Sequence, residues 1–258
     1  MTRKPGKPAS EADERYRAPA LDKGLDILEL LSEQPGGLTR AEILKAMGRG
    51  PSEVYRMLER LVARDFVARS REGDRYALTM KLFVLGHRHP PVRRLVARAL
   101  PLMDVFADQA IQSCHLVVAD RHEAVVVAHA SPSGNWEFGI RVGAQIDFLG
   151  TSSGQMLLAF QDELTRRELL QHWQGTEKAA AYARLEPTLK QFRKAGHRIG
   201  ESQQIRGVQD ITAPILSPEG DAIAVLTCPY IKRLDAAQRS IGETLSLLEE
   251  IAATLSMS

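Results

Sequence analysis

The 258-residue sequence is poor in cysteine, has no long apolar run and carries no strong excess of charge of either sign. Its two cysteines, Cys114 and Cys228, are too few for a disulfide framework. No apolar stretch reaches the roughly 18 residues of a membrane-spanning helix, so we expect no membrane partner. The basic segment from Met1 to Ser10 has no apolar core behind it and is not a secretory signal. The composition therefore predicts a reduced, cytoplasmic, globular chain.

The net charge of +2 is unevenly divided along the chain. Residues 1–90 hold 17 Lys and Arg against 13 Asp and Glu, whereas residues 91–258 hold 17 against 19. Every basic residue between positions 49 and 80 is an arginine. The guanidinium fork suits phosphate contact because it donates two parallel hydrogen bonds. A solvated helix face would give a similar count, so this charge does not define a function by itself.

Residues 20–64 show the periodicity of three consecutive helices. Leucines recur at helical spacing from residue 21 to residue 31, and Pro35-Gly36-Gly37 ends that segment. Thr39-Arg40-Ala41-Glu42 has the form of a capping box and starts a short helix that runs to Met47. After a turn at residues 48–51, a third helix is predicted from Ser52 to about residue 64.

A period of two follows these helices. Residues 66–70 and 75–78 flank the polar loop Arg71-Glu72-Gly73-Asp74, which predicts a β-hairpin. The order of helix, helix-turn-helix and hairpin is that of a winged helix-turn-helix, whose third helix enters the major groove of DNA. We place this domain at residues 19–79, after a disordered tail at residues 1–18 that is rich in Lys, Pro, Glu and Arg.

The rest of the chain predicts linker helices over residues 80–112, interrupted at His89-Pro90-Pro91, and a second domain over residues 113–258. The strand pattern of the second domain favours hairpins over β-α-β units, so the fold class is α+β with two domains. The predicted strands cover residues 114–119, 123–130, 138–142, 211–216 and 222–228, and the predicted helices cover residues 152–160, 164–173, 186–195 and 235–255.

Three stretches, in this order, resemble the IclR family of bacterial transcriptional regulators. The first is residues 21–31 with Gly37-Leu38-Thr39, the second is the recognition helix at residues 54–61, and the third joins residues 150–159 to residues 207–215. The resemblance implies an N-terminal winged helix-turn-helix joined by a helix to a GAF/PAS-like antiparallel-sheet domain that binds an effector. It also implies assembly as a homodimer or homotetramer.

The candidate DNA contacts lie on the capped helix, the recognition helix and the wing. Arginine is the commonest bidentate reader of guanine, whereas wing residues more often touch phosphate. Where many family members have Pro-Lys-Ser-Thr before the recognition helix, this chain has Gly50-Pro51-Ser52-Glu53, and Glu53 would accept from a cytosine amino group but repel a phosphate. The candidates are Thr39, Arg40, Ser52, Glu53, Tyr55, Arg56, Arg60, Arg69, Arg71 and Arg75.

The candidate effector contacts centre on the turn Gly150-Thr151-Ser152-Ser153-Gly154, which opens a helix whose first N–H groups suit an anionic group. The resemblance places this turn in the effector pocket, together with Thr227 from a late strand. Two positions differ from the family pattern: Asp210 stands where many members carry Cys, and Thr227-Cys228-Pro229 stands where serines are usual. The candidates are Phe138, Arg141, Thr151, Ser152, Ser153, Gly154, Asp210 and Thr227.

The sequence therefore predicts a ligand-responsive DNA-binding regulator without catalysis, metal or cofactor. Its expected partners are a double-stranded DNA operator, a small carboxylate-bearing metabolite and further copies of the same chain. Residues 150–154 also match the Gly-x-Ser-x-Gly elbow of serine hydrolases, with Ser152 as nucleophile, but the second domain is short for a hydrolase sheet. A metal site at Cys114, His115, His122 and His129, with Cys228 as a further ligand, fits no zinc spacing. A constitutive DNA-binding oligomer without an effector is the other alternative.

Overall fold

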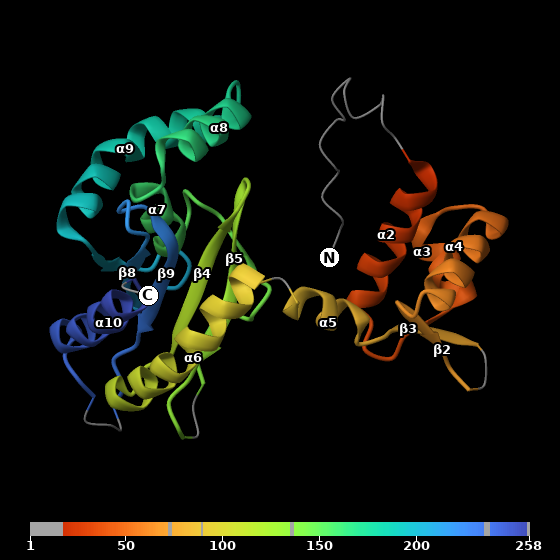
Figure 1. Cartoon of the computed structure of the whole chain (residues 1–258), viewed down its shortest axis with the longest axis horizontal. Coiled ribbons are helices and arrows are strands. Elements are labelled where there is room, and N and C mark those ends of the chain that lie inside the picture. Colours follow the sequence, from red (N-terminus) through yellow and green to blue (C-terminus); the bar gives the residue numbers. More distant parts are fainter. Residues whose placement is uncertain (1–17, 72–73, 89, 135–136, 235–237, 257–258) are drawn as a thin grey trace. The chain divides into compact units, whose positions relative to one another are not determined.

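The computed structural model describes residues 18–71, 74–88, 90–134, 137–234 and 238–256. The chain divides into two compact units, with the boundary between residues 89 and 90 (Figure 1). The tail predicted over residues 1–18 lies outside the described residues except for Ala18, as do Glu72 and Gly73 of the predicted hairpin loop. No helix of the described ranges combines the length and the apolar character that crossing a membrane requires.

The first unit is a three-helix bundle with a small antiparallel sheet, which confirms the predicted winged helix-turn-helix. Its strands pair in the order β1-β3-β2, and β2 and β3 form the wing. A core that includes Ile27, Ile43, Val54 and Leu58 lies between the helices and the sheet. The elements are α2 (Pro19–Ser32), β1 (Leu38–Thr39), α3 (Arg40–Met47), α4 (Pro51–Ala63), β2 (Val67–Arg69), β3 (Arg75–Leu78) and α5 (Lys81–His87).

Local residue signals, including the predicted capping box, set the ends of these helices. Thr39 Oγ1 accepts a hydrogen bond from the backbone N–H of Glu42, and Glu42 accepts one from the backbone N–H of Thr39, so the capping box of α3 is complete. Gly48 ends α3 in the left-handed conformation with φ 59°. Pro51 stands in the first turn of α4, where its missing N–H costs no hydrogen bond.

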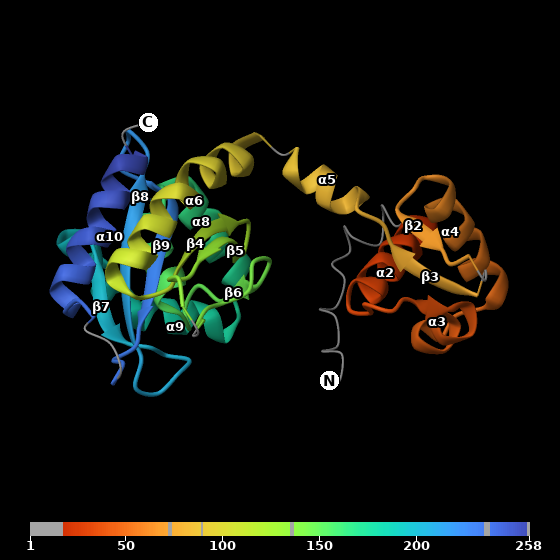
Figure 2. The same ribbon diagram turned by 90° about the horizontal axis from the view of Figure 1, so that it is seen from below.

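The second unit is a six-stranded antiparallel sheet with helices on both faces (Figure 2). One face packs against α6 and α10, and the other packs against α7, α8 and α9. The strands run in the order β6-β5-β4-β9-β8-β7. The elements are α6 (Pro90–Ala110), β4 (Cys114–Asp120), β5 (Glu123–Ala130), β6 (Gln145–Ile146), α7 (Ser152–Ala159), α8 (Glu163–Trp173), α9 (Glu177–Ala195), β7 (Arg198–Glu201), β8 (Gln209–Leu216), β9 (Ala222–Tyr230) and α10 (Ile241–Ser256).

The structure corrects four details of the second unit. The strand predicted at residues 138–142 is irregular, and the chain pairs with β5 only after Gly143 turns it with φ 86°. The edge strand β7 was not predicted, and α9 begins nine residues before the predicted start. The terminal helix begins at Ile241, because Ser240 and Glu243 form a capping box there.

Candidate functional site

The exposed side of α4 carries half of the ten DNA-contact candidates. Arg40, Ser52, Tyr55 and Arg56 line one shallow groove between α3 and α4. The Tyr55 side chain stays exposed, and the Arg40 guanidinium lies 5.8 Å from the centre of its ring. Arg60 is exposed one helical turn beyond Arg56 on α4. These residues form a polar surface with three guanidinium groups on and beside the second helix of the helix-turn-helix.

Two other candidates have partners inside the unit. Glu53 Oε1 lies 2.8 Å from Lys23 Nζ of α2, and the hydrogen bond and charge of Lys23 lower the pKa of Glu53. Thr39 holds the N-terminus of α3 through the capping box. Glu53 therefore stabilises the contact between α2 and α4, and Thr39 stabilises the N-terminus of α3.

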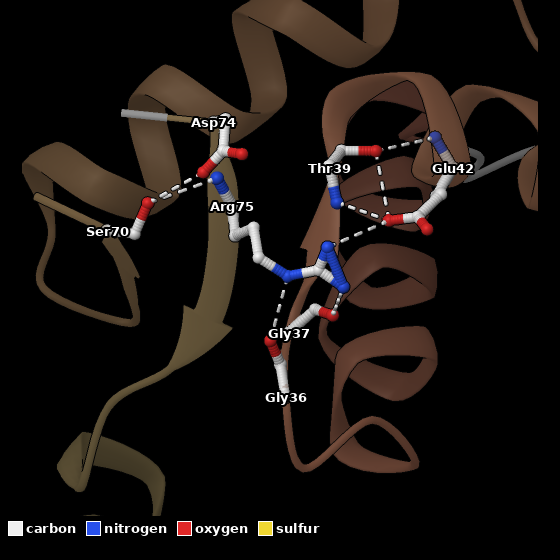
Figure 3. A network of polar contacts seen from close by, with 7 residues as sticks. All are labelled: Gly36, Gly37, Thr39, Glu42, Ser70, Asp74 and Arg75. Atoms are coloured by element: carbon white, nitrogen blue, oxygen red, sulfur yellow. Dashed lines mark hydrogen bonds and ion pairs between the residues drawn. The ribbon is translucent and has the colours of Figure 1, made fainter. Parts of the chain in front are cut away.

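Arg75 connects the wing to the segment before α3 (Figure 3). Its Nε and Nη2 donate hydrogen bonds to the carbonyl oxygens of Gly36 and Gly37, at 3.2 and 3.3 Å. Its Nη1 lies 3.7 Å from Glu42 Oε2 of the capping box. Arg75 thus orients the hairpin relative to α3. Of the other two wing candidates, Arg69 has its guanidinium carbon 5.8 Å from the centre of the Tyr76 ring, and Arg71 is exposed.

In the second unit, a cavity of about 90 Å³ lies at the N-terminus of α7. Thr151 caps this helix by accepting a hydrogen bond from the N–H of Gly154 at 3.1 Å. The preceding turn is fixed by Asp147, whose Oδ1 accepts from the N–H groups of Leu149 and Gly150. Position 154 requires glycine, because a Cβ there would lie 2.4 Å from the carbonyl oxygen of Asp147 and 2.5 Å from the Cα of Phe148.

A chain of hydrogen bonds at one side of the cavity joins three charged or polar side chains. Arg198 Nη1 donates to Ser152 Oγ at 2.5 Å, and Ser152 Oγ donates to Asp210 Oδ2 at 2.6 Å. Arg198 and Asp210 are both buried. Burial lowers the pKa of Arg198, and the nearby Asp210 carboxylate opposes that shift. Ser152 and Asp210 line the cavity, and the positive side chain of Arg198 is linked to Asp210 through the Ser152 hydroxyl from outside that lining.

A second polar group lies on the floor of the cavity. Ser153 Oγ is 2.8 Å from Thr227 Oγ1, and His115 Nε2 is 3.4 Å from Ser153 Oγ. The His115 side chain is 2% exposed, and its Nδ1 has no hydrogen-bond partner among the described residues. Burial, with a smaller effect of His129, lowers the pKa of His115 to about 3. The imidazole is therefore neutral at physiological pH.

The structure brings most of the effector candidates together. Arg141 is exposed and is not among the lining residues, and Gly154 supports the turn from behind. Sequence reasoning missed His115 as a pocket residue and missed Arg198 altogether. The alternation along β4 could have placed His115 on the α7 face, whereas no local signal marked Arg198. The candidates that line the cavity are Phe138, Thr151, Ser152, Ser153, Asp210 and Thr227.

The hydrogen bonds of Ser152 differ from those of a serine nucleophile. A Ser-His-Asp triad needs an imidazole between the acid and the hydroxyl. Here Asp210 accepts directly from Ser152, and the histidine of the cavity contacts Ser153 instead. The antiparallel sheet also differs from the largely parallel sheet on which the Gly-x-Ser-x-Gly elbow is built.

A winged helix-turn-helix with arginines on its second helix, together with a unit whose cavity carries several polar side chains, defines a DNA-binding regulator with an effector domain. Comparison with known protein families identifies the family of this regulator. Residues 20–71 match the IclR helix-turn-helix domain, and residues 91–257 match the C-terminal domain of bacterial transcriptional regulators of the IclR type. The chain belongs to the IclR family.

Individual relatives are similar over most of their length. The transcriptional regulator KdgR of Escherichia coli K12 is 26% identical over 239 residues, which cover 91% of this chain and 90% of KdgR. XynR of the same organism is 25% identical over 224 residues, covering 85% of this chain and 89% of XynR. Both are transcriptional regulators of the helix-turn-helix type.

Solved structures share the fold. An IclR regulator from Alicyclobacillus acidocaldarius has a TM-score of 0.70 and 25% identity, over 94% of this chain and 99% of that one. An IclR homologue from Microbacterium hydrocarbonoxydans, crystallised with 4-hydroxybenzoate, has a TM-score of 0.73 and 23% identity, over 92% of this chain and 98% of that one.

Proposed function

We propose that this chain is a ligand-responsive transcriptional regulator that binds a small carboxylate-bearing metabolite in the cavity at the N-terminus of α7. Binding would shift the equilibrium between two states of the chain that differ in operator affinity. The size of this shift cannot exceed the difference in the effector's binding free energy between the two states. The protein would act in the cytoplasm, without catalysis, as a homodimer or homotetramer in which each winged helix reads one half-site.

The cavity at the start of α7 is the observation that carries this proposal. The first N–H groups of a helix lack partners within the helix and favour an anion. The hydroxyl groups of Ser153 and Thr227 supply further donors on the same side. Asp210 is an acceptor for a hydroxyl or amine of the effector, because Arg198 balances its charge through Ser152. The 4-hydroxybenzoate bound by the Microbacterium hydrocarbonoxydans homologue is a carboxylate too.

On the DNA side, the groove between α3 and α4 supports base reading by Arg56 and Tyr55. Both side chains are exposed, and Arg40 and Ser52 stand beside them. Arg69 and Arg71 of the wing would contact phosphates and contribute little to sequence preference.

Fluorescence anisotropy tests the proposal with the full-length protein. The probe is labelled DNA from upstream of its own gene, with a scrambled duplex as control, across a salt series. We expect preference for the upstream DNA to persist as salt rises, and a carboxylate ligand to change that affinity. Equal and steeply salt-dependent binding to both duplexes would mean phosphate contact only and would contradict operator recognition.

An arginine pair sharpens this experiment. Arg56→Ala should weaken binding to the upstream DNA by about tenfold or more, corresponding to about 1–3 kcal/mol for a bidentate base contact. Arg167→Ala removes the same charge from α8 of the second unit, where the side chain is exposed and paired with Glu163. Equal losses in the two variants would contradict the assignment of Arg56 to base reading.

A further inference from the structure

His115, one of the residues that line the proposed effector cavity, has a buried hydrogen-bonding atom without a partner among the described residues. Its ring lines the cavity and is 2% exposed, yet Nδ1 has no partner among the described residues. Buried polar atoms in native proteins are nearly always paired, because the lost hydrogen bonds to water are not otherwise replaced. Nε2 is already directed to Ser153 Oγ at 3.4 Å. Nδ1 is therefore the free hydrogen-bonding position of this side chain.

The strand pattern places His115 on the floor of the cavity. Cys114 and Leu116, its neighbours along β4, belong to the core formed with α6 and α10. His115 therefore faces the opposite side of the sheet, toward α7. In the sheet register its partner on β9 is Thr227 and its partner on β5 is His129. An apolar residue would satisfy packing at this buried position without leaving a polar atom unpaired.

The protonation state decides which ligand group fits Nδ1. The imidazole is neutral, so one ring nitrogen donates and the other accepts. Ser153 Oγ can donate to Nε2 or accept from it, since the hydroxyl of Thr227 at 2.8 Å can fill the complementary role. Either tautomer is therefore available. A hydroxyl group of the ligand can pair with Nδ1 in either tautomer, because a hydroxyl is at once a donor and an acceptor.

The volume of the cavity favours a small effector. The cavity of about 90 Å³ is well below the roughly 150 Å³ of an engineered protein cavity that binds benzene. A carboxylate with a few further heavy atoms fits this space.

We propose that His115 Nδ1 hydrogen-bonds an uncharged hydroxyl group of the effector, which is a compact aliphatic hydroxy-carboxylate. This inference rests on the proposed function, because it assumes that the carboxylate occupies the N-terminus of α7. His115 is then a specificity-determining residue that distinguishes a hydroxy acid from the parent acid.

Isothermal titration calorimetry of the full-length protein with two matched ligand pairs tests the inference: glycolate against acetate, and lactate against propionate. We expect the wild-type protein to bind the hydroxy acid of at least one pair about tenfold more tightly, equivalent to about 1.4 kcal/mol. His115→Leu should reduce that ratio to within about twofold. His197→Leu, which removes a histidine paired with Glu249 outside the cavity lining, should keep it.

Two isosteric variants separate a hydrogen bond from a packing effect. In Asn, an amide atom stands at the position of Nδ1, whereas in Gln an amide atom stands at the position of Nε2. We expect His115→Asn to retain preference for the hydroxy acid and His115→Gln to lose it. Retention of the preference in His115→Leu, or its loss in Asn and Gln alike, would overturn the assignment of Nδ1.

The ligand series distinguishes failure of this inference from failure of the proposed function. Equal binding of both members of each aliphatic pair refutes the role of His115 but supports a carboxylate effector. Binding of 4-hydroxybenzoate and benzoate, with neither aliphatic pair bound, refutes the compact effector and again leaves the carboxylate proposal standing. Binding of none of these six acids refutes the carboxylate effector and, with it, this inference.

Discussion

The neutral state of His115 makes the stability of the second unit depend on pH. In the folded chain, burial and the neighbouring His129 lower the pKa of His115 from 6.5 to about 3. In the unfolded chain the imidazole has its ordinary pKa and binds a proton as the pH falls below 6.5. Because only the unfolded state binds this proton between pH 6.5 and about 3, the free energy of unfolding decreases as the pH falls through that window.

The expected size follows from the linkage relation. About pH 5 lies roughly 1.5 units below the ordinary pKa, and each unit corresponds to about 1.4 kcal/mol. Between about pH 7.5 and about pH 5, the wild-type protein should therefore lose about 2 kcal/mol more than His115→Asn, which has no titrating group at residue 115. The carboxylates common to both proteins contribute similar losses, which cancel in the difference.

Urea unfolding of the full-length protein measures this difference. Both tryptophans of the sequence lie in the second unit, and Trp173 is 2% exposed, so tryptophan fluorescence follows this unit. The slope with urea should be the same in both proteins, and the midpoints should shift by different amounts with pH. Equal losses in wild type and His115→Asn would refute the buried, neutral imidazole.

Two further predictions concern the turns that set the ends of helices. Thr39→Ala removes the N-cap of α3 and should lower stability by about 1 kcal/mol, measured by far-ultraviolet circular dichroism of thermal unfolding; an unchanged transition of the first unit would contradict the capping role. Gly154→Ala places a Cβ against backbone atoms of Asp147 and Phe148 and should cost about 1–3 kcal/mol in urea unfolding, whereas Gly242→Ala in α10, where a Cβ meets nothing within 4 Å, should cost none. Equal effects of the two glycine variants would contradict the close approach at residue 154.

The sequence was informative where structure depends on neighbouring residues. The structure confirms the capping box predicted at Thr39, and α3 ends at Gly48, where the predicted turn begins. Helix α4 begins at Pro51, one residue before the predicted start at Ser52. The alternation along residues 114–130 similarly identified β4 and β5. These elements have strong local signals, and local and tertiary preferences agree in them.

Elements that depend on distant partners were not predictable in the same way. The four residues of β7 pair with β8 at the sheet edge, and such short edge strands have little intrinsic preference to detect. Pro187 lies inside α9, so the sequence suggested a helix start near that proline instead of at Glu177. The segment at residues 138–142 alternates in polarity, yet the backbone hydrogen bonds found there among the described residues lie at its C-terminal end, where Ala144 donates to Arg141 and Gly143 donates to Val126.

The same distinction between local signals and distant contacts explains which residues of the candidate site could be predicted from the sequence. Ser152, Asp210 and Thr227 followed from a family resemblance, whereas Arg198 reaches Ser152 only because β7 pairs with β8. Asp210 alone would repel a carboxylate ligand and would be costly to bury without a partner. Arg198 compensates its charge through Ser152, so an acidic residue is compatible with a carboxylate site at this position. The difference from the cysteine of many family members at residue 210 therefore has to be interpreted together with Arg198, which is linked to Asp210 through Ser152.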